Sequence, residues 1–216
     1  MKKFWFFDLD GTLADTDWDI REAWKAALLD LGLVCPDFDA RFVAGPPLDV
    51  MFRQLMPADY TPARAEALRL RFGAHYDSDG FPHTTEYPGV RAAISELRRR
   101  GAKVFIATNK RYAGATAMAR RFGWETLLDG LYAGDQHRDD AIGVLRKPAL
   151  LRFALECEGA RADESVMIGD TRNDFEAARE NGIVSVAVAW GYGTPEERNE
   201  ADYLIHSADE LLTQSF

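Results

Sequence analysis

Short apolar runs alternate with stretches of helical periodicity over most of the sequence. The apolar runs have the length and composition of buried strands, and they cover residues 4–7, 103–107, 131–134, 165–168, 184–188 and 203–205. Apolar residues that recur every three or four positions predict helices over residues 90–100, 112–122, 147–158 and 209–213 and in a stretch that ends at residue 181. Strands that alternate with helices favour an α/β fold with a doubly wound parallel sheet.

Residues 14–86 interrupt this alternation. Apolar residues follow helical spacing from Ile20 to Leu31, and a second helical stretch covers residues 39–43. Pro47 can open a third helix, and Thr61-Pro62 can cap and open a fourth. Because no strand pattern is found between residues 14 and 85, we expect an all-helical insertion. The predicted organisation is a core domain of residues 1–13 and 87–216 with an inserted domain of residues 14–86.

Composition narrows the partners and the compartment. The formal net charge of -9 argues against a nucleic-acid partner, which would require a basic face. The two cysteines, Cys35 and Cys157, lie far apart and are expected to be reduced thiols, as in cytosolic proteins. No apolar run is long enough for a signal peptide or a membrane span. We therefore expect a cytoplasmic protein, a monomer or a homodimer, with no membrane partner.

The first strand ends in two carboxylates, Asp8 and Asp10, followed by Gly11. The carboxyl ends of parallel strands form the ligand crevice of an open α/β sheet, so both side chains would lie at the mouth of the sheet. Carboxylates this close repel each other and tend to share a proton or a divalent cation. The plainer alternative is an acidic hairpin turn at Asp10-Gly11.

Three further strand ends or helix starts carry polar groups: Thr108 with Asn109, Lys147, and Asp170 with Asp174. Each has a plainer explanation when it is taken alone. Thr108-Asn109 can be an ordinary N-cap, the two aspartates can stabilise a helix N-terminus, and a Lys before a Pro at a helix start is unremarkable. The occurrence of all four groups in this order favours a common site.

Taken together, Asp8-Leu9-Asp10-Gly11-Thr12, Thr108, Lys147, and Gly169-Asp170 with Asp174 resemble the haloacid dehalogenase superfamily of phosphotransferases. The resemblance extends from residue 4 to residue 205. The helical insert resembles the cap domain of the phosphoglycolate phosphatase branch, as do Gly45-Pro46-Pro47-Leu48 and Trp190-Gly191-Tyr192-Gly193. The resemblance to this superfamily implies a Rossmann-like core with an inserted helical cap, and a Mg²⁺-dependent phosphatase acting on a small phosphorylated metabolite.

The chemistry of phosphate monoesters agrees with this implication. Their unaided hydrolysis is very slow, and an aspartyl-phosphate on Asp8 would divide the barrier into two steps. The side chains of Asp8 and Asp170 and the backbone carbonyl of Asp10 offer the hard oxygen ligands that Mg²⁺ prefers. Asp174 can join this ligand set or orient its waters. The carboxyl of Asp10 would then protonate the leaving oxygen and deprotonate the attacking water.

Other residues are expected to hold the substrate. Lys147 would pair with Asp8 and the phosphoryl group, and Lys110 is the second choice for this cation. Phosphoryl oxygens would be bound by Thr108 and the amides of Asn109 and Lys110, together with residues of the first motif, Gly11 and Thr12. In the cap, Gly45, Pro46 and Arg53 are candidates for contact with the leaving group.

Several alternatives to a phosphoglycolate phosphatase-like enzyme remain open. Within the same branch these are a 5′-nucleotidase, a pyrophosphatase and a sugar phosphomutase. A non-catalytic phosphate-binding regulator is the alternative outside the enzymes. Asp10 argues against carbon–halogen and carbon–phosphorus cleavage, because the branches with those activities lack an Asp at this position.

Overall fold

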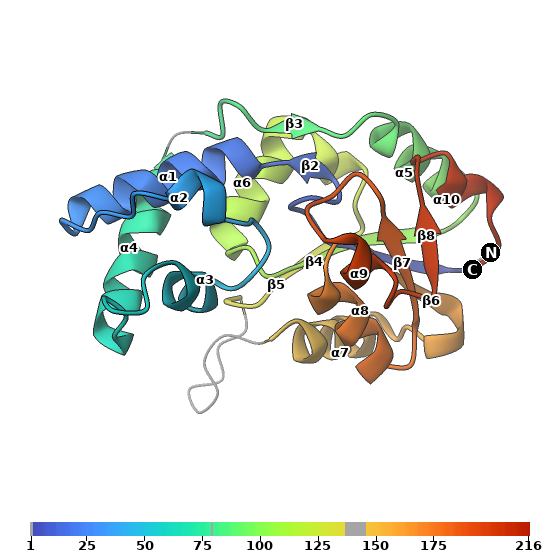
Figure 1. The fold of residues 1–216 in the computed structure, drawn as a ribbon. Coiled ribbons are helices and arrows are strands. Elements are labelled where there is room, and N and C mark those ends of the chain that lie inside the picture. The colour runs from blue at the N-terminus through green and yellow to red at the C-terminus, as the bar shows by residue number, and fades with distance from the viewer. Residues whose placement is uncertain (1, 79, 137–145) are drawn as a thin grey trace. The chain divides into compact units, whose positions relative to one another are not determined.

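The computed structural model describes residues 2–78, 80–136 and 146–216, and the chain forms two compact units (Figure 1). The core unit consists of Met1–Asp15 and Thr85–Phe216, and the insert unit consists of Thr16–Thr84.

The core unit is built on a six-stranded sheet with the order β5-β4-β1-β6-β7-β8, in which every neighbouring pair is parallel. The strands are β1 Phe4–Phe7, β4 Lys103–Thr108, β5 Gly130–Ala133, β6 Ser165–Gly169, β7 Val184–Val188 and β8 Tyr203–Ile205. All six lie within one residue of the predicted bounds. The predicted doubly wound parallel α/β sheet is therefore confirmed.

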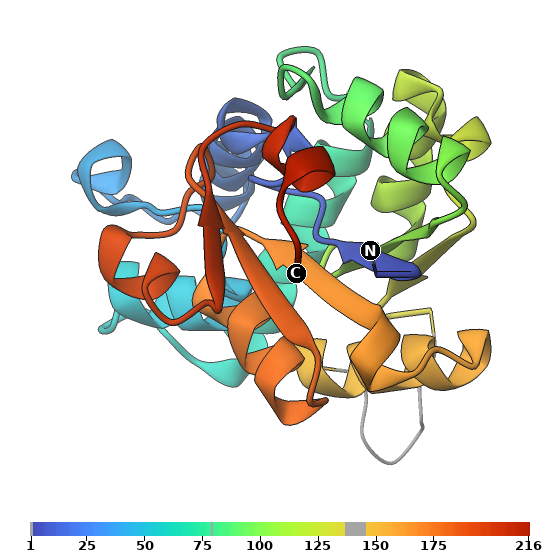
Figure 2. The same cartoon turned by 90° about the vertical axis from the view of Figure 1, so that its right-hand side faces the viewer.

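Helices cover both faces of this sheet (Figure 1, Figure 2). One face carries α5 (Val90–Arg99) and α6 (Tyr112–Phe122), and the other carries α7 (Lys147–Glu158) and α8 (Arg172–Glu180). The short helices α9 (Pro195–Arg198) and α10 (Glu210–Thr213) lie near the C-terminus, and single 3₁₀ turns lie at Trp124–Thr126 and Ala162–Glu164. The sequence did not predict α9, because four residues are too few to show helical periodicity.

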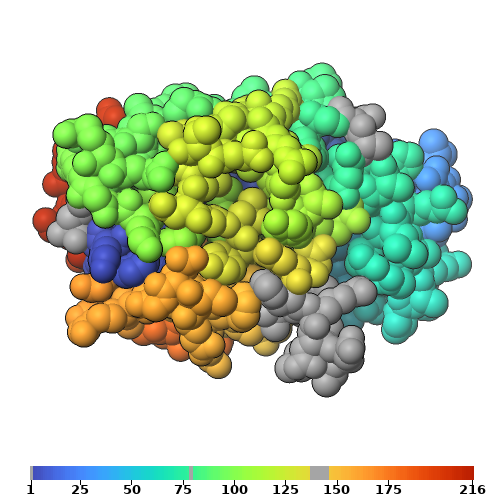
Figure 3. Space-filling view, turned by 180° about the vertical axis from the view of Figure 1, so that it is seen from behind, coloured from blue at the N-terminus to red at the C-terminus, as the bar shows by residue number. Residues whose placement is uncertain are grey.

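The central strand is buried on both sides. Phe4 and Phe6 stack on Phe105 of β4 and belong to an apolar cluster with residues of α7 and α8. Trp5 and Phe7 point to the opposite face, because side chains alternate along a strand. The surface drawn in Figure 3 shows α5 and α6, green to yellow, beside α7 in orange. Burial on both sides explains why the strands are continuous apolar runs.

The strand order places three chain segments at one point. Phe7 is level with Ile106 of β4 and Ile168 of β6, so the three strands end side by side. The connections from β1 to β4 and from β5 to β6 run in opposite directions across the sheet, and such a reversal opens a crevice at the carboxyl ends. Residues directly after β1, β4 and β6 therefore meet there.

The insert unit contains α1 (Asp17–Asp30), α2 (Phe38–Arg41), α3 (Leu48–Leu55) and α4 (Pro62–Ser78). Its core includes Trp24, whose indole contacts Phe38, Phe42 and Phe72. Asp19 is buried in α1. Its carboxylate accepts hydrogen bonds from the backbone of His83 and from the backbone and hydroxyl of Thr84. The start of the insert is thus tied to its end.

The prediction that no strand lies between residues 14 and 85 is wrong at both ends. Strand β2 (Ala14–Asp15) pairs antiparallel with β3 (Thr85–Glu86), where Ala14 faces Glu86 and Asp15 faces Thr85. Two-residue strands are too short to show alternation in the sequence. In the described part of the chain, no helix has both the length and the apolar character needed to cross a membrane.

Phe105→Ala should lower the free energy of unfolding of the core unit by about 3–5 kcal/mol, because a buried ring that stacks on two others would leave a cavity. Urea denaturation followed by far-UV circular dichroism measures this change. Tyr112→Ala removes an aromatic ring that is 41% exposed, and it should change stability by less than about 0.5 kcal/mol. Equal effects of the two substitutions would contradict the described packing.

Candidate active site

Two aspartates lie in the turn that follows β1. Asp8 comes directly after the strand, and its N–H donates to the Ile168 carbonyl at 2.9 Å. The chain then turns sharply at Gly11, whose φ of 76° favours glycine and whose N–H donates to the Ala14 carbonyl. The side chains of Asp8 and Asp10 are 15% and 22% exposed, so both are accessible at the mouth of the sheet.

Three carboxylates converge at this point. Asp8, Asp170 after β6 and Asp174 in the first turn of α8 each offer an oxygen, and these oxygens lie within 4.8 Å of one another. Asp170 and Asp174 are buried, with exposures of 1% and 0%. The structure therefore brings together the side chains of three of the four predicted metal ligands. The fourth, Asp10, was predicted to contribute its backbone carbonyl, and it lies two residues after Asp8.

Lys147, the first residue of α7, is buried beside the cluster. Its Nζ lies 2.8 Å from Asp8 Oδ1 and 2.9 Å from Asp174 Oδ1. These are ion-pair distances, and neither carboxylate oxygen has another partner among the described residues. Three ionised carboxylates against one ammonium leave two formal negative charges uncompensated.

The pKa shifts reflect burial and this excess of negative charge. Burial raises the pKa of Asp8 to about 6, although the Lys147 ammonium opposes the rise. Burial, together with repulsion from Asp174 and Asp8, raises the pKa of Asp170 well above its ordinary value. Burial lowers the pKa of Lys147, but the charges of Asp174 and Asp8 outweigh it and raise that pKa overall.

The donor set fits a small divalent cation. Carboxylate oxygens are the hard ligands that Mg²⁺ prefers, and such a cation would offset the uncompensated charge and give Asp8 Oδ1 and Asp174 Oδ1 a second partner beside Lys147. Asp174 also caps its own helix, because its Oδ2 accepts from the backbone N–H and the hydroxyl of Thr171, both at 3.1 Å. The capping role and a role in the cluster use different oxygens of the same carboxylate.

The end of β4 brings Thr108, Asn109 and Lys110 to the same mouth. The Thr108 hydroxyl is buried and accepts from the Lys110 N–H at 3.2 Å. The alternative prediction, that Thr108 is an ordinary helix N-cap, is not observed, because α6 begins at Tyr112. The Lys110 ammonium lies on the carboxyl of Asp10, a pairing that the sequence did not predict.

Three glycines make room for Asp170. A Cβ at Gly11 would lie 2.1 Å from Asp170 Oδ2, one at Gly191 would lie 2.2 Å from Asp170 Cβ, and one at Gly193 would lie 1.9 Å from the Asp170 carbonyl oxygen. Between the last two, the N–H of Tyr192 donates to Asp170 Oδ2 at 2.8 Å. This backbone contribution was absent from the predicted site, and the Gly-Tyr-Gly sequence after β7 is the signal that could have revealed it.

The hydroxyl of Thr12 also reaches Asp170, with a distance of 3.4 Å from Oγ1 to Oδ1. The Thr12 hydroxyl therefore contacts a carboxylate of the cluster. Trp190, in the same loop as Tyr192, donates from its indole N–H to the Thr12 carbonyl at 3.1 Å. The loop of residues 190–193 thus holds both the first turn and Asp170 in place.

The remaining predicted residues belong to the insert unit. Gly45 and Pro46 lie in the loop before α3, and Arg53 lies within that helix. The Arg53 guanidinium lies 4.5 Å from the centre of the Tyr60 ring and donates to the Tyr60 hydroxyl at 2.9 Å. Within the insert unit, Arg53 is thus held by an aromatic neighbour.

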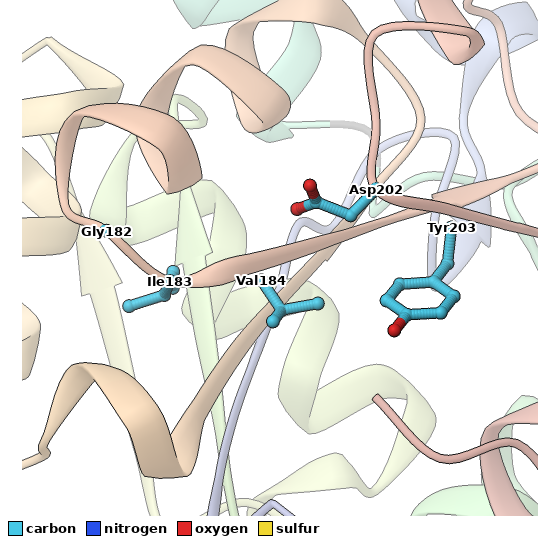
Figure 4. A pocket seen from close by; sticks show the side chains of 5 residues that line it. All are labelled: Gly182, Ile183, Val184, Asp202 and Tyr203. Carbon is cyan, nitrogen blue, oxygen red and sulfur yellow. The ribbon is translucent and has the colours of Figure 1, made fainter.

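A separate hollow lies at the opposite ends of the strands, and it is lined by Gly182, Ile183, Val184, Asp202 and Tyr203 (Figure 4). Its one carboxylate, Asp202, accepts hydrogen bonds from the backbone and hydroxyl of Ser185, both at 2.8 Å. Those bonds give Asp202 a structural role in joining β7 and β8. The chemistry is therefore concentrated at the carboxyl ends of β1, β4 and β6.

The sequence matches a known protein family over most of its length. The family model of haloacid dehalogenase-like hydrolases matches residues 5–188. The chain is similar to the phosphoglycolate phosphatase, plasmid, of Cupriavidus necator, with 33% identity over 94% of this chain and 89% of the relative. It is also similar to the 5′-nucleotidase of Pseudomonas aeruginosa, with 31% identity over 88% of this chain and 84% of the relative.

The chain is also similar to a protein named as a kinase and to a solved structure. Tyrosine-protein kinase PtkA of Mycobacterium tuberculosis is 29% identical over 95% of this chain and 69% of its own length. Among solved structures, that of a predicted phosphatase from Clostridium acetobutylicum has a TM-score of 0.87 and 27% identity, covering 99% of this chain and 97% of that one. The chain is thus similar to proteins named as phosphatases and to one named as a tyrosine-protein kinase.

Gly191→Ala should weaken Mg²⁺ binding at least about tenfold, because the added Cβ displaces Asp170 from the cluster. Isothermal titration calorimetry measures the affinity. Gly182→Ala is the matched control: its Cβ meets no atom within 4 Å, so it should cost about 1 kcal/mol of stability from its positive φ and leave the affinity unchanged. Normal Mg²⁺ binding by Gly191→Ala would contradict the proposed role of this glycine.

Proposed function

This chain belongs to the haloacid dehalogenase-like hydrolase family, and on that premise we propose that it is a magnesium-dependent phosphatase acting on a small phosphorylated metabolite. The observation that carries the proposal is the convergence of the Asp8, Asp170 and Asp174 carboxylates at the end of the central strand, where the Lys147 ammonium pairs with Asp8 and Asp174. Phosphatases among its relatives support the enzyme class, a phosphoric monoester hydrolase.

Asp8 is the proposed nucleophile. It is the one member of the carboxylate cluster with an accessible side chain, since Asp170 and Asp174 are buried. Its carboxylate oxygen would attack phosphorus while the bond to the leaving oxygen breaks, giving an aspartyl-phosphate. The Lys147 ammonium, 2.8 Å from Asp8 Oδ1, would offset charge on the carboxylate and on the phosphoryl group.

Asp10 is the proposed acid and base. Its carboxyl would protonate the leaving oxygen in the first step and then remove a proton from the water that attacks the aspartyl-phosphate. The second step releases inorganic phosphate and restores the Asp8 carboxylate. Asp10 suits this role because its side chain is partly exposed and follows the nucleophile by two residues.

The metal would be held by the side chains of Asp8, Asp170 and Asp174 and by the backbone carbonyl of Asp10. When bound, it supplies positive charge that stabilises the phosphoryl oxygens. The Thr108 hydroxyl and the amides of Asn109 and Lys110 are the proposed phosphoryl contacts from the protein. Gly11 and Thr12 complete this set from the first turn.

A phosphoglycolate phosphatase-like activity is the first candidate, and a 5′-nucleotidase is the second, because relatives with both names resemble the chain over most of its length. A pyrophosphatase and a sugar phosphomutase are further alternatives. The residues of the insert unit are proposed to form a cap, in which Gly45, Pro46 and Arg53 contact the leaving group. A non-catalytic regulator is disfavoured, because Asp8, Asp10, Lys147 and Asp170 are all present.

Asp8→Asn should reduce the turnover of p-nitrophenyl phosphate at least about a thousandfold, because the amide cannot form the aspartyl-phosphate. Release of p-nitrophenol measures the rate. Asp163→Asn alters an exposed carboxylate that pairs with Arg161 far from the cluster, and it should turn over like the parent protein. Full activity of Asp8→Asn would refute the covalent mechanism.

Removal of divalent cations with EDTA should abolish turnover, and added Mg²⁺ should restore it, because the cluster is proposed to hold the cation that stabilises the phosphoryl oxygens. Asp170→Asn should need at least about tenfold more Mg²⁺ for half-maximal activity. The same titration with Asp163→Asn provides the control. Turnover that survives complete chelation would refute the metal dependence.

A further inference from the structure

A second buried lysine, distinct from the one in the carboxylate cluster, lies at the site. Lys110 follows β4, and its side chain is only 5% exposed. Its Nζ lies 2.8 Å from Asp10 Oδ1 and 3.2 Å from Asp10 Oδ2, so one ammonium contacts both oxygens of the carboxyl group. β4 and β1 are neighbours in the sheet, so the same backbone pairing fixes the starting points of both side chains.

The two lysines contact different carboxyl groups. Lys147 faces Asp8 and Asp174, whereas Lys110 makes hydrogen bonds of good length to Asp10. Among the described residues, Lys110 is the side-chain partner found for the Asp10 carboxyl. A carboxyl group in a turn, with 22% exposure, would otherwise be free to adopt other rotamers.

We propose that Lys110 is the positioning residue of Asp10, which it holds where the leaving oxygen departs. This inference rests on the proposed phosphatase function and adds a role that the sequence did not indicate. Proton transfer requires the carboxyl oxygen within hydrogen-bond reach of the leaving oxygen, and a misplacement of about 1 Å can cost about a hundredfold in rate. Lys110 would therefore act on the reaction through the placement of Asp10.

Leaving groups provide the readout that separates positioning from other roles. A nitrophenolate departs as a stable anion and needs little help from an acid. An alkoxide needs a proton as the bond to phosphorus breaks. Loss of a well-placed acid should therefore penalise alkyl phosphates far more than nitrophenyl phosphates, whereas loss of a phosphate-binding cation should penalise both alike.

The test compares kcat/KM of Lys110→Met and the parent protein for a series from 2,4-dinitrophenyl phosphate to simple alkyl phosphates. Met keeps the length and apolar stem of the side chain but removes the ammonium. The loss for alkyl phosphates should exceed that for nitrophenyl phosphates at least about thirtyfold, within the range of general acid catalysis. Lys110→Arg should recover part of the alkyl phosphate activity, because its guanidinium can also contact both oxygens.

Four variants complete the design. Asp10→Asn should show the same dependence on the leaving group, and the double variant with Lys110→Met should lose little more than Asp10→Asn alone. Lys147→Met should lower both substrate classes, because Lys147 faces Asp8. Lys103→Met, at the far end of β4 and on an exposed residue, is the matched control and should behave like the parent protein.

An equal loss of both substrate classes in Lys110→Met would overturn the proposal and assign Lys110 to phosphate binding. An unchanged profile would overturn it as well. A gain on alkyl phosphates would mean that the ammonium restrains the acid, which also contradicts positioning. If the parent protein hydrolyses no member of the series, the proposed function fails instead, so the two failures are distinguishable.

Discussion

Electrostatic repulsion among carboxylates is the constraint on which the rest of this structure depends. Asp8, Asp170 and Asp174 come from two different strand ends and one helix, and the burial of Asp170 and Asp174 makes the mutual repulsion stronger than it would be in water. The fold holds them together through rigid elements. The strands fix their backbones, Thr171 occupies one oxygen of Asp174, and the Tyr192 amide occupies one oxygen of Asp170. Lys147 supplies the opposite charge that the cluster requires.

This constraint also explains the placement of glycines. Where Asp170 is surrounded by backbone, Gly11, Gly191 and Gly193 leave no side-chain atoms that would collide with it. Glycine therefore occupies three positions at which the backbone passes close to one buried carboxylate. Asp10 has different surroundings, because its side chain is partly exposed and pairs with Lys110. Pairing with Lys110 instead of Lys147 thus distinguishes Asp10, the carboxylate proposed to move protons, from the carboxylates of the cluster.

Much of the core could be predicted from the sequence because strong, local signals determine it. The strands β1, β4, β6 and β7 are mostly apolar runs, and the aspartates follow two of them directly, so the strand ends also located the carboxylates. The pairing of Lys110 with Asp10 could not be predicted, because it joins residues 100 positions apart and depends on side-chain placement. The Tyr192 amide was missed for a related reason: Gly191 and Gly193 mark a close backbone approach, but only the folded loop shows that the approach is to Asp170. The strands β2 and β3 were missed because two residues cannot show a period.

The short ladder between β2 and β3 has a consequence for how this architecture can vary. The chain leaves the core unit after Asp15 and returns at Thr85, and these two residues face each other in register. The departing and returning strands are therefore about 5 Å apart whatever lies between them. Residues 16–84 can change in length, sequence or helix number without altering the spacing of the core strands or the carboxylates that follow them. The insert can thus be exchanged as a module, while the backbone positions of the acidic cluster stay fixed by the core sheet.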